Sequence, residues 1–286
     1  GGNYNTVVGD EAGTAITTGD GNTALGFQCG DALTTGNYNV AIGYDALSTN
    51  STGSACIAIG KEALKVNTSS NNTAVGRVAL TANTSGTYNT AIGDGSLSSN
   101  TTAANNTAVG HNAMVANTTG TVNVAVGSSA LAANTTASYN TAVGQSALSS
   151  NTTAAQNTGL GYAALTNATT GADNTATGSQ ALANTTTGAS NTAVGRSALQ
   201  LNTTGRDNTA VGYSAAATNT TGVENVSMGM YALRFNTTGG SNTALGYLAL
   251  HRNTTASNNT AVGRYALEAN TTGTQSVAVG ALSLDA

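Results

Sequence analysis

The sequence repeats itself every seventeen residues along the whole chain. The phrase Asn-Thr-Ala-Val-Gly recurs with its glycine at that spacing, for example at Gly178, Gly195 and Gly212, and only the step from Gly60 to Gly76 is sixteen residues. A short fixed period predicts a solenoid, in which coils stack and each coil completes the core of its neighbour. The repeat therefore argues against an ordinary globular enzyme.

One repeat can be numbered from its first Asn, as in residues 191–207. Positions 1 to 5 read Asn-Thr-Ala-Val-Gly, positions 8 and 9 read Ala-Leu, and positions 12 to 15 read Asn-Thr-Thr-Gly. β-branched residues favour a strand at positions 2 to 4, Gly permits a corner at position 5, and Asn-Thr-Thr-Gly is typical of a turn. Two glycines in each period leave no room for a helical stripe. The pattern predicts an all-β parallel β-solenoid, or β-roll, of about seventeen coils.

The interior of the coil is predicted less directly, because the pattern does not decide which strand face is buried. Positions 2 and 4 share one face and position 3 points to the other. We expect the larger Val and Leu side chains to fill each coil. The small Ala face would then allow close approach of a second wall, which another chain could supply. So thin a core leads us to expect self-association.

Asparagine occupies the first position in fifteen of seventeen coils, with Cys56 and Ser276 as the departures. Stacked Asn side chains can hydrogen-bond along the axis of a stack, as amide ladders do in cross-β structures. We interpret the column as a structural ladder. Its members are Asn5, Asn22, Asn39, Asn72, Asn89, Asn106, Asn123, Asn140, Asn157, Asn174, Asn191, Asn208, Asn225, Asn242 and Asn259.

The chain divides into variant coils at residues 1–38 and regular coils at residues 39–286, all within one predicted repeat array. The variant coils carry an extra Gly and a shifted Ala-Ile or Ala-Leu. Neither end of the sequence carries a charged or helical cap, which solenoids normally need. We therefore expect either a piece of a longer array or subunits that stack end to end as a fibre.

Aromatic residues recur at positions 6 and 17, which vary between coils and are expected to be exposed. Such residues can bind glycans or proteins, or pack between subunits of a fibre, and we favour the packing role. The candidates are Phe27, Tyr44, Tyr162, Tyr213 and Tyr247 at position 6, and Tyr38, Tyr88 and Tyr139 at position 17.

Each coil from Asn50 onward holds an Asn-x-Ser/Thr sequence in its turn, which is the acceptor pattern for N-glycosylation. Ordinary turn chemistry explains the same residues, because Asn and Thr satisfy nearby backbone groups. We favour the turn interpretation and keep glycosylation as an alternative. The candidates are Asn50, Asn67, Asn83, Asn100, Asn117, Asn134, Asn151, Asn167, Asn184, Asn202, Asn219, Asn236, Asn253 and Asn270.

Catalytic, metal and cofactor sites are not predicted. His111 and His251 lie many coils apart at different repeat positions. The densest acidic group, Asp10, Glu11, Asp20 and Asp31, could bind calcium, but we favour solvated turn carboxylates. No stretch is apolar enough to span a membrane, and no signal peptide is evident at the first residues. A net charge of -4 gives no indication of nucleic-acid binding.

The two cysteines, Cys29 and Cys56, occupy different repeat positions one to two coils apart. A disulfide between them is one alternative. We favour two small buried or half-buried side chains.

The phrases Val40-Ala41-Ile42-Gly43 and Ser276-Val277-Ala278-Val279-Gly280 resemble the head repeats of trimeric autotransporter adhesins. The longer unit is similar to repeats in phage tail fibres and other bacterial surface proteins, and the similarity covers essentially the whole chain. The resemblance implies a left-handed β-roll, a homotrimer wound about one axis, and exposure on a cell or virion surface. Adhesin head coils of this kind are usually shorter than seventeen residues.

These observations lead us to expect a structural extracellular fibre or adhesin shaft that self-assembles and displays a repeated surface. Its partners would be further copies of the chain and a host surface or glycan receptor. One alternative is the shaft of a phage tail fibre. Another is an ice-binding solenoid with stacked Thr rows at positions 2, 13 and 14. A polysaccharide-cleaving tail spike would need recurring paired carboxylates, which the sequence lacks.

Overall fold

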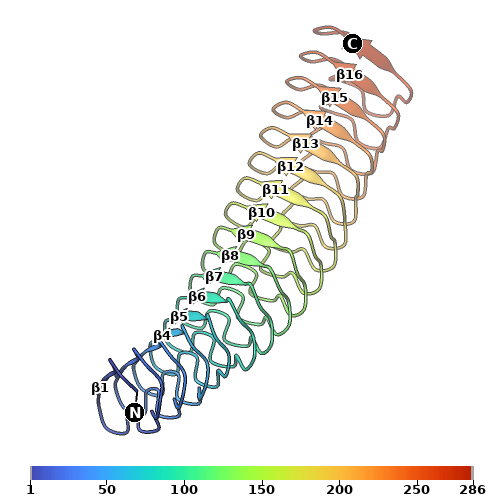
Figure 1. Ribbon diagram of the computed structural model, residues 1–286. Helices are drawn as coiled ribbons and strands as arrows, with labels where there is room; N and C mark the ends of the chain where they lie inside the picture. Colours follow the sequence, from blue (N-terminus) through green and yellow to red (C-terminus); the bar gives the residue numbers. More distant parts are fainter. Residues whose placement is uncertain (1, 285–286) are drawn as a thin grey trace. The chain divides into compact units, whose positions relative to one another are not determined.

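The computed structural model describes residues 2–284 as a parallel β-solenoid with one short strand per coil and about 16 coils. No helix occurs in these residues, and none therefore could cross a membrane. The predicted all-β parallel solenoid is confirmed. Contacts divide the chain into two compact units, residues 1–140 and 141–286, each of which is a stack of coils (Figure 1).

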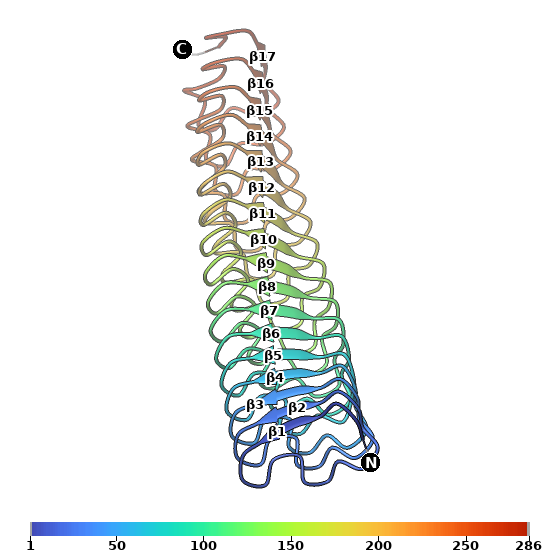
Figure 2. The same ribbon diagram turned by 60° about the vertical axis from the view of Figure 1, so that its left-hand side comes forward.

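The first unit contains one parallel sheet in which each strand pairs with the strand one coil away. Equivalent residues pair with one another, as Thr73 does with Thr90, so side chains of one kind form columns. Figure 2 shows the strands of this unit following one another along the stack. The strands are β1 (Thr6–Val8), β2 (Thr23–Leu25), β3 (Val40–Ile42), β4 (Ile57–Ile59), β5 (Thr73–Val75), β6 (Thr90–Ile92), β7 (Thr107–Val109) and β8 (Val124–Val126).

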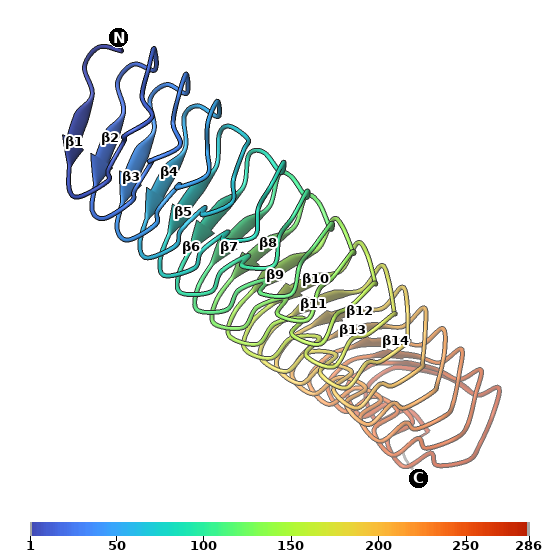
Figure 3. The same cartoon turned by 90° about the horizontal axis from the view of Figure 1, so that it is seen from below.

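The second unit repeats the arrangement with the same register, as in the pairing of Thr192 with Thr209. Figure 3 shows the coils of each unit as successive loops with one strand on each. The strands are β9 (Thr141–Val143), β10 (Thr158–Leu160), β11 (Thr175–Thr177), β12 (Thr192–Val194), β13 (Thr209–Val211), β14 (Val226–Met228), β15 (Thr243–Leu245), β16 (Thr260–Val262) and β17 (Val277–Val279).

The valines of position 4 were expected to fill the interior of the coil, but in the structure they point outward. Ala193 at position 3 is fully buried, whereas Val194 at position 4 is 37% exposed, and other coils follow the same pattern. The interior is filled by Ala at positions 3 and 8 and by Leu at position 9, such as Leu199. Leu was therefore predicted correctly, but the aliphatic residues of position 4 lie outside.

The narrowness of the coil explains why Ala points inward. Gly159 takes the position of the inward Ala in β10, and a Cβ added there would lie 3.3 Å from the carbonyl oxygen of Ala164 and 3.4 Å from Cγ of Leu148. One methyl group fits in contact with the opposite wall, whereas a branched side chain would collide with it.

Two backbone features close the corners of the coil. Gly at position 5 has φ near +130°, and at Gly195 a Cβ would lie 2.5 Å from the carbonyl oxygen of Gly212 in the next coil. Leu at position 9 adopts the left-handed region, with φ of 50° at Leu199, although side chains disfavour it. That conformation turns the Leu side chain into the core, where its burial compensates for the strain.

The variant coils fill the same core from a different position. In the second coil Gly30 replaces the usual Leu at position 9, and Leu33 at position 12 is buried instead. A Cβ on Gly30 would lie 2.9 Å from Cδ1 of Leu33. Gly at position 9 leaves room for Leu at position 12, so the two replacements depend on each other. This gives a physical reason for the different pattern of residues 1–38.

The inward position of Ala predicts opposite responses at neighbouring residues of β12. Ala193→Val should lower the free energy of unfolding by about 1–3 kcal/mol, because two extra methyl groups enter a full interior. Val194→Thr should change it by less than about 1 kcal/mol when the chain is dissociated, because the outer face of the single chain is open to solvent and tolerates a hydroxyl. Urea unfolding of both variants checks this. A larger loss for Val194→Thr than for Ala193→Val would place the valines inside.

Candidate functional site

The Asn column at position 1 forms a hydrogen-bonded ladder inside each unit, as the sequence predicts. Asn208 is 1% exposed. Its side-chain nitrogen donates to Oδ1 of Asn191 at 3.1 Å and to the carbonyl oxygen of Gly222 at 2.8 Å. Its oxygen accepts from the backbone nitrogen of Asn225 at 3.0 Å. Each amide therefore connects one coil to the next and also bridges its own coil.

A second Asn ladder runs through the turn at position 12, and it meets the first ladder at a shared carbonyl. Asn219 donates to Oδ1 of Asn202 at 3.0 Å and to the carbonyl oxygen of Gly222 at 3.0 Å. Gly222 thus accepts from both Asn208 and Asn219. The two amides fasten the turn to the strand side of the same coil.

This second ladder consists of residues that the sequence offered as glycosylation sites. Eleven of the fourteen are fully buried, and a glycan attached to any of them would prevent the coil from closing; they are Asn50, Asn67, Asn83, Asn100, Asn117, Asn134, Asn151, Asn202, Asn219, Asn236 and Asn253. Asn270 is partly exposed. Asn167 and Asn184, shifted by one position, lie at the surface, where Asn167 donates to Asn184 at 3.1 Å.

The first ladder is interrupted at the one sixteen-residue coil, and a serine compensates there. Cys56 replaces Asn and still donates its backbone N–H to Asn39 at 2.9 Å. In the shortened turn, the hydroxyl of Ser69 donates to Oδ1 of Asn67 at 2.8 Å and accepts from Asn72 at 3.0 Å. The one-residue deletion and the replacement of Asn by Cys56 therefore occur in the same coil.

Both cysteines are buried free thiols, so the structure contains no disulfide between Cys29 and Cys56. Burial raises the pKa of each thiol, because the thiolate would lose its hydration. Sγ of Cys56 lies 3.2 Å from the carbonyl oxygen of Ser69, to which it donates. The cysteines are small core residues in this fold.

The outer face of each sheet presents a column of Thr or β-branched residues at position 2 and a column of aliphatic residues at position 4. The residues of the second column lie side by side in the pairings, as Val194 and Val211 do. Such a column is an apolar stripe along the strands of each unit, interrupted in β11 by Thr177, which pairs with Val194. By contrast, Thr at position 13 directs its hydroxyl along the stack, as Thr203 does to the carbonyl oxygen of Thr220 at 3.0 Å.

The predicted aromatic residues separate into exposed and clustered groups. Tyr38, Tyr88, Tyr139 and Tyr162 are all more than half exposed, whereas Phe27 stacks on Tyr44 with ring centroids 5.5 Å apart. Tyr213 and Tyr247 also pack against rings, but their partners are Tyr231 and Tyr265 at position 7. Loss of hydration in this packing raises the pKa of Tyr247, and the neighbouring Tyr265 adds to the effect.

Arginine residues lie over these rings in the second unit. The guanidinium carbon of Arg234 is 4.6 Å from the ring centre of Tyr231 and 5.2 Å from that of Phe235. Arg264 is 4.7 Å from the Tyr265 ring, and Arg196 is 5.9 Å from the Tyr213 ring. We call Arg196, Tyr213, Tyr231, Arg234, Phe235, Arg264 and Tyr265 the arginine–aromatic surface.

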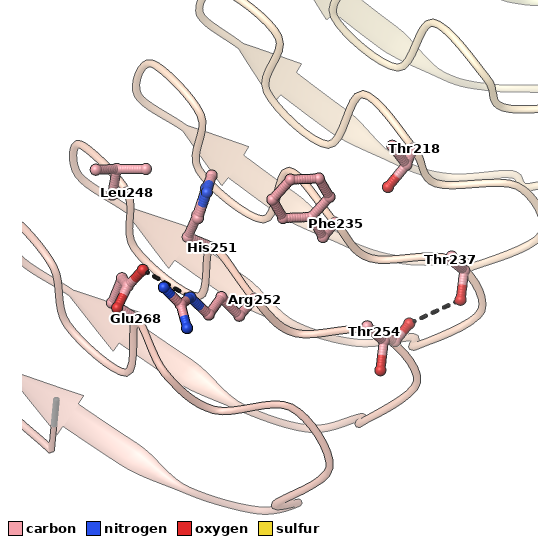
Figure 4. A pocket seen from close by; sticks show the side chains of 8 residues that line it. All are labelled: Thr218, Phe235, Thr237, Leu248, His251, Arg252, Thr254 and Glu268. Atoms are coloured by element: carbon pink, nitrogen blue, oxygen red, sulfur yellow. Dashed lines mark hydrogen bonds and ion pairs between the residues drawn. The ribbon is translucent and has the colours of Figure 1, made fainter. Parts of the chain in front are cut away.

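An open groove of about 690 Å³ lies beside this surface (Figure 4). Phe235 and His251 form part of its lining, with ring centroids 4.9 Å apart, and Nδ1 of His251 donates to the carbonyl oxygen of Tyr231 at 3.1 Å. Arg252 pairs with Glu268 at 3.2 Å. Thr218, Thr237 and Thr254 follow one another along the opposite side (Figure 4).

The histidines and the acidic residues near the beginning of the chain are the remaining groups considered in the sequence analysis. His111 lies in the first unit and His251 in the second. Among residues 2–284, no three His, Cys, Asp or Glu side chains come together as a metal site would need. Near the beginning of the chain, Asp20 instead accepts a hydrogen bond from the backbone of Asn3 at 2.6 Å.

The sequence analysis does not predict the arginine–aromatic surface, because it considers only the aromatic residues of positions 6 and 17, whereas this surface also includes residues of positions 7, 10 and 11. Tyr231, Phe235 and Tyr265 were not singled out, nor was Arg234. A signal was present, because aromatic and basic residues concentrate between residues 213 and 268. Since coils stack in register, residues at adjacent variable positions in successive repeats become neighbours.

The Asn ladder predicts a large loss of stability for Asn208→Asp at pH 7. The carboxylate has nearly the same shape, but it cannot donate to Gly222 and would bring a charge into the interior. We expect the free energy of unfolding to fall by about 3 kcal/mol or more. Asn258→Asp, at an exposed position, should change it by no more than about 0.5 kcal/mol. Equal effects in urea unfolding would argue against the ladder.

Because both thiols are buried, we expect them to react slowly with thiol reagents in the folded state. At pH 8 neither cysteine should react with a chromogenic disulfide reagent, and both should react in denaturant. Because folding raises the thiol pKa values, stability should fall as the pH rises from the ordinary value, about 8.5, through the raised values. Rapid labelling of the native chain would contradict this burial.

Comparison with known proteins does not assign the chain to a family. No protein-family model matches it, and no curated protein is similar enough in sequence to match.

Proposed function

We propose that this chain is the shaft of a structural extracellular fibre or adhesin that self-associates and displays a repeated surface. The observation that carries the proposal is the pair of buried Asn ladders, which connect most coils to their neighbours by side-chain as well as backbone hydrogen bonds. Such a stack resists bending because most coils are held by hydrogen bonds on two sides. The resemblance to adhesin and tail-fibre repeats supports the same role, including that of a phage tail-fibre shaft.

The proposed self-association uses the outer strand face. Its aliphatic column at position 4 remains exposed in the single chain, for example at Val143 and Val194. Columns of this kind are a typical surface for sheet packing, because the side chains are regular and largely apolar. We propose a homotrimer with these faces directed toward one another, as the resemblance implies, and left-handed coils.

An ice-binding role is a second candidate, favoured by one observation. Thr at position 2 forms an outward column beside the aliphatic residues, as at Thr192 and Thr209 in paired strands. Val or Ile interrupts that column in some coils, such as β3 and β4. The Thr residues of position 13 direct their hydroxyls to carbonyl groups instead. Thermal hysteresis of the purified chain would support this candidate, and its absence at high concentration would remove it.

The shaft proposal predicts an oligomer that depends on the outer strand face. Sedimentation velocity should show a trimer, and Val194→Lys combined with Val211→Lys should convert it to monomer by placing charges in the interface. Thr204→Lys, at an exposed turn position, is the matched control and should leave the trimer intact. Antibody to the folded chain should label intact source cells or particles. A monomeric wild-type chain, or labelling only after permeabilisation, would contradict the proposal.

A further inference from the structure

We propose that the groove beside the arginine–aromatic surface binds an oligosaccharide that carries carboxylate groups. The inference rests on the proposed surface role and specifies what an exposed shaft would recognise. Phe235 contributes an apolar ring, 41% exposed, on which the face of a sugar can pack. Arg252 and Arg234 place guanidinium groups at or beside the same groove.

The guanidinium of Arg234 is held by rings and forms no ion pair with a carboxylate among residues 2–284. It lies over both Tyr231 and Phe235, which restrains the side chain without neutralising its charge. A planar guanidinium held in this way can donate two parallel hydrogen bonds to a carboxylate. The charge of Arg252 is paired with Glu268 through Nε of the guanidinium. The two terminal nitrogens of Arg252 can therefore act as further donors to a ligand.

The opposite side of the groove favours a ligand with hydroxyl groups. Thr237 donates its hydroxyl proton to the carbonyl oxygen of Thr254 at 3.0 Å, and Thr218 donates to that of Arg234 at 2.8 Å. Their oxygens are consequently available as acceptors. Sugar hydroxyls can donate to such oxygens, and Thr237 and Thr254 lie at the same repeat position in successive coils (Figure 4).

A nucleic-acid strand fits the same groove less well. Its phosphates can only accept hydrogen bonds, so they gain little from the Thr oxygens, to which the many hydroxyl groups of a sugar can donate. Strands without sequence preference are bound in grooves that are positive along their length. In the second unit, five Lys and Arg residues are balanced by five Asp and Glu residues in residues 141–286. The combined donors, acceptors and ring favour an acidic sugar.

The test is binding to the purified full chain by titration calorimetry and by amide chemical-shift changes. The probes are tetragalacturonic acid and 3′-sialyllactose, with methyl-esterified tetragalacturonate and lactose as neutral partners and a thymidine dodecamer as the nucleic-acid probe. We expect an acidic probe to bind at least about tenfold more tightly than its neutral partner, with shifts around Phe235.

Arg234→Ala should weaken that binding about tenfold or more, and Arg234→Lys should weaken it less. Arg206→Ala is the matched control, because Arg206 is exposed and paired with Asp207 at a different edge of the coil. The proposal is overturned if neither acidic sugar binds, if neutral and acidic sugars bind equally, or if only the dodecamer binds. Because the trimer is measured separately by sedimentation, loss of sugar binding alone would leave the shaft proposal intact.

Discussion

The structure depends on amide side chains that hydrogen-bond from coil to coil in the buried interior of the stack. In the coils that carry Asn at both positions 1 and 12, the two residues donate to one carbonyl group, as Asn208 and Asn219 do to Gly222, and each also bonds to its equivalent in a neighbouring coil. Buried polar groups destabilise a fold unless they are paired, and here each pairing is itself a contact between coils. This interaction supplements a core that offers only one large side chain per coil.

The narrow interior determines what the molecule presents outside. Only a small side chain such as Ala or Ser fits between the strand and the opposite wall, so the β-branched residues of positions 2 and 4 point outward. The same feature that makes the single chain thin therefore creates a regular outer face suited to packing. The variable corner positions are released from core packing and can carry rings and arginines, as they do around Tyr231 and Arg234.

Much of this fold can be predicted from the sequence, because the period, the strand at positions 2 to 4 and the Asn column follow from local chemistry. The sequence does not predict which face of the strand is buried. Thr-Ala-Val is compatible with burial of either face until the width of the coil is known. The second ladder was hidden for a similar reason. Asn-Thr-Thr-Gly predicts a turn, but whether Asn202 faces solvent or the interior depends on the left-handed conformation of Leu199, which no propensity favours. The arginine–aromatic surface could not be predicted from the repeat pattern, because its residues come from different positions in successive repeats.

The most direct test of this account is hydrogen exchange of the Asn side-chain amides, followed by nuclear magnetic resonance. The account predicts that the amide protons of buried residues such as Asn191, Asn208 and Asn219 exchange slowly, at rates comparable to the backbone amides of the strands, while those of the exposed Asn258 exchange rapidly. Rapid exchange at every Asn side chain would show that the ladders do not exist and would contradict the account.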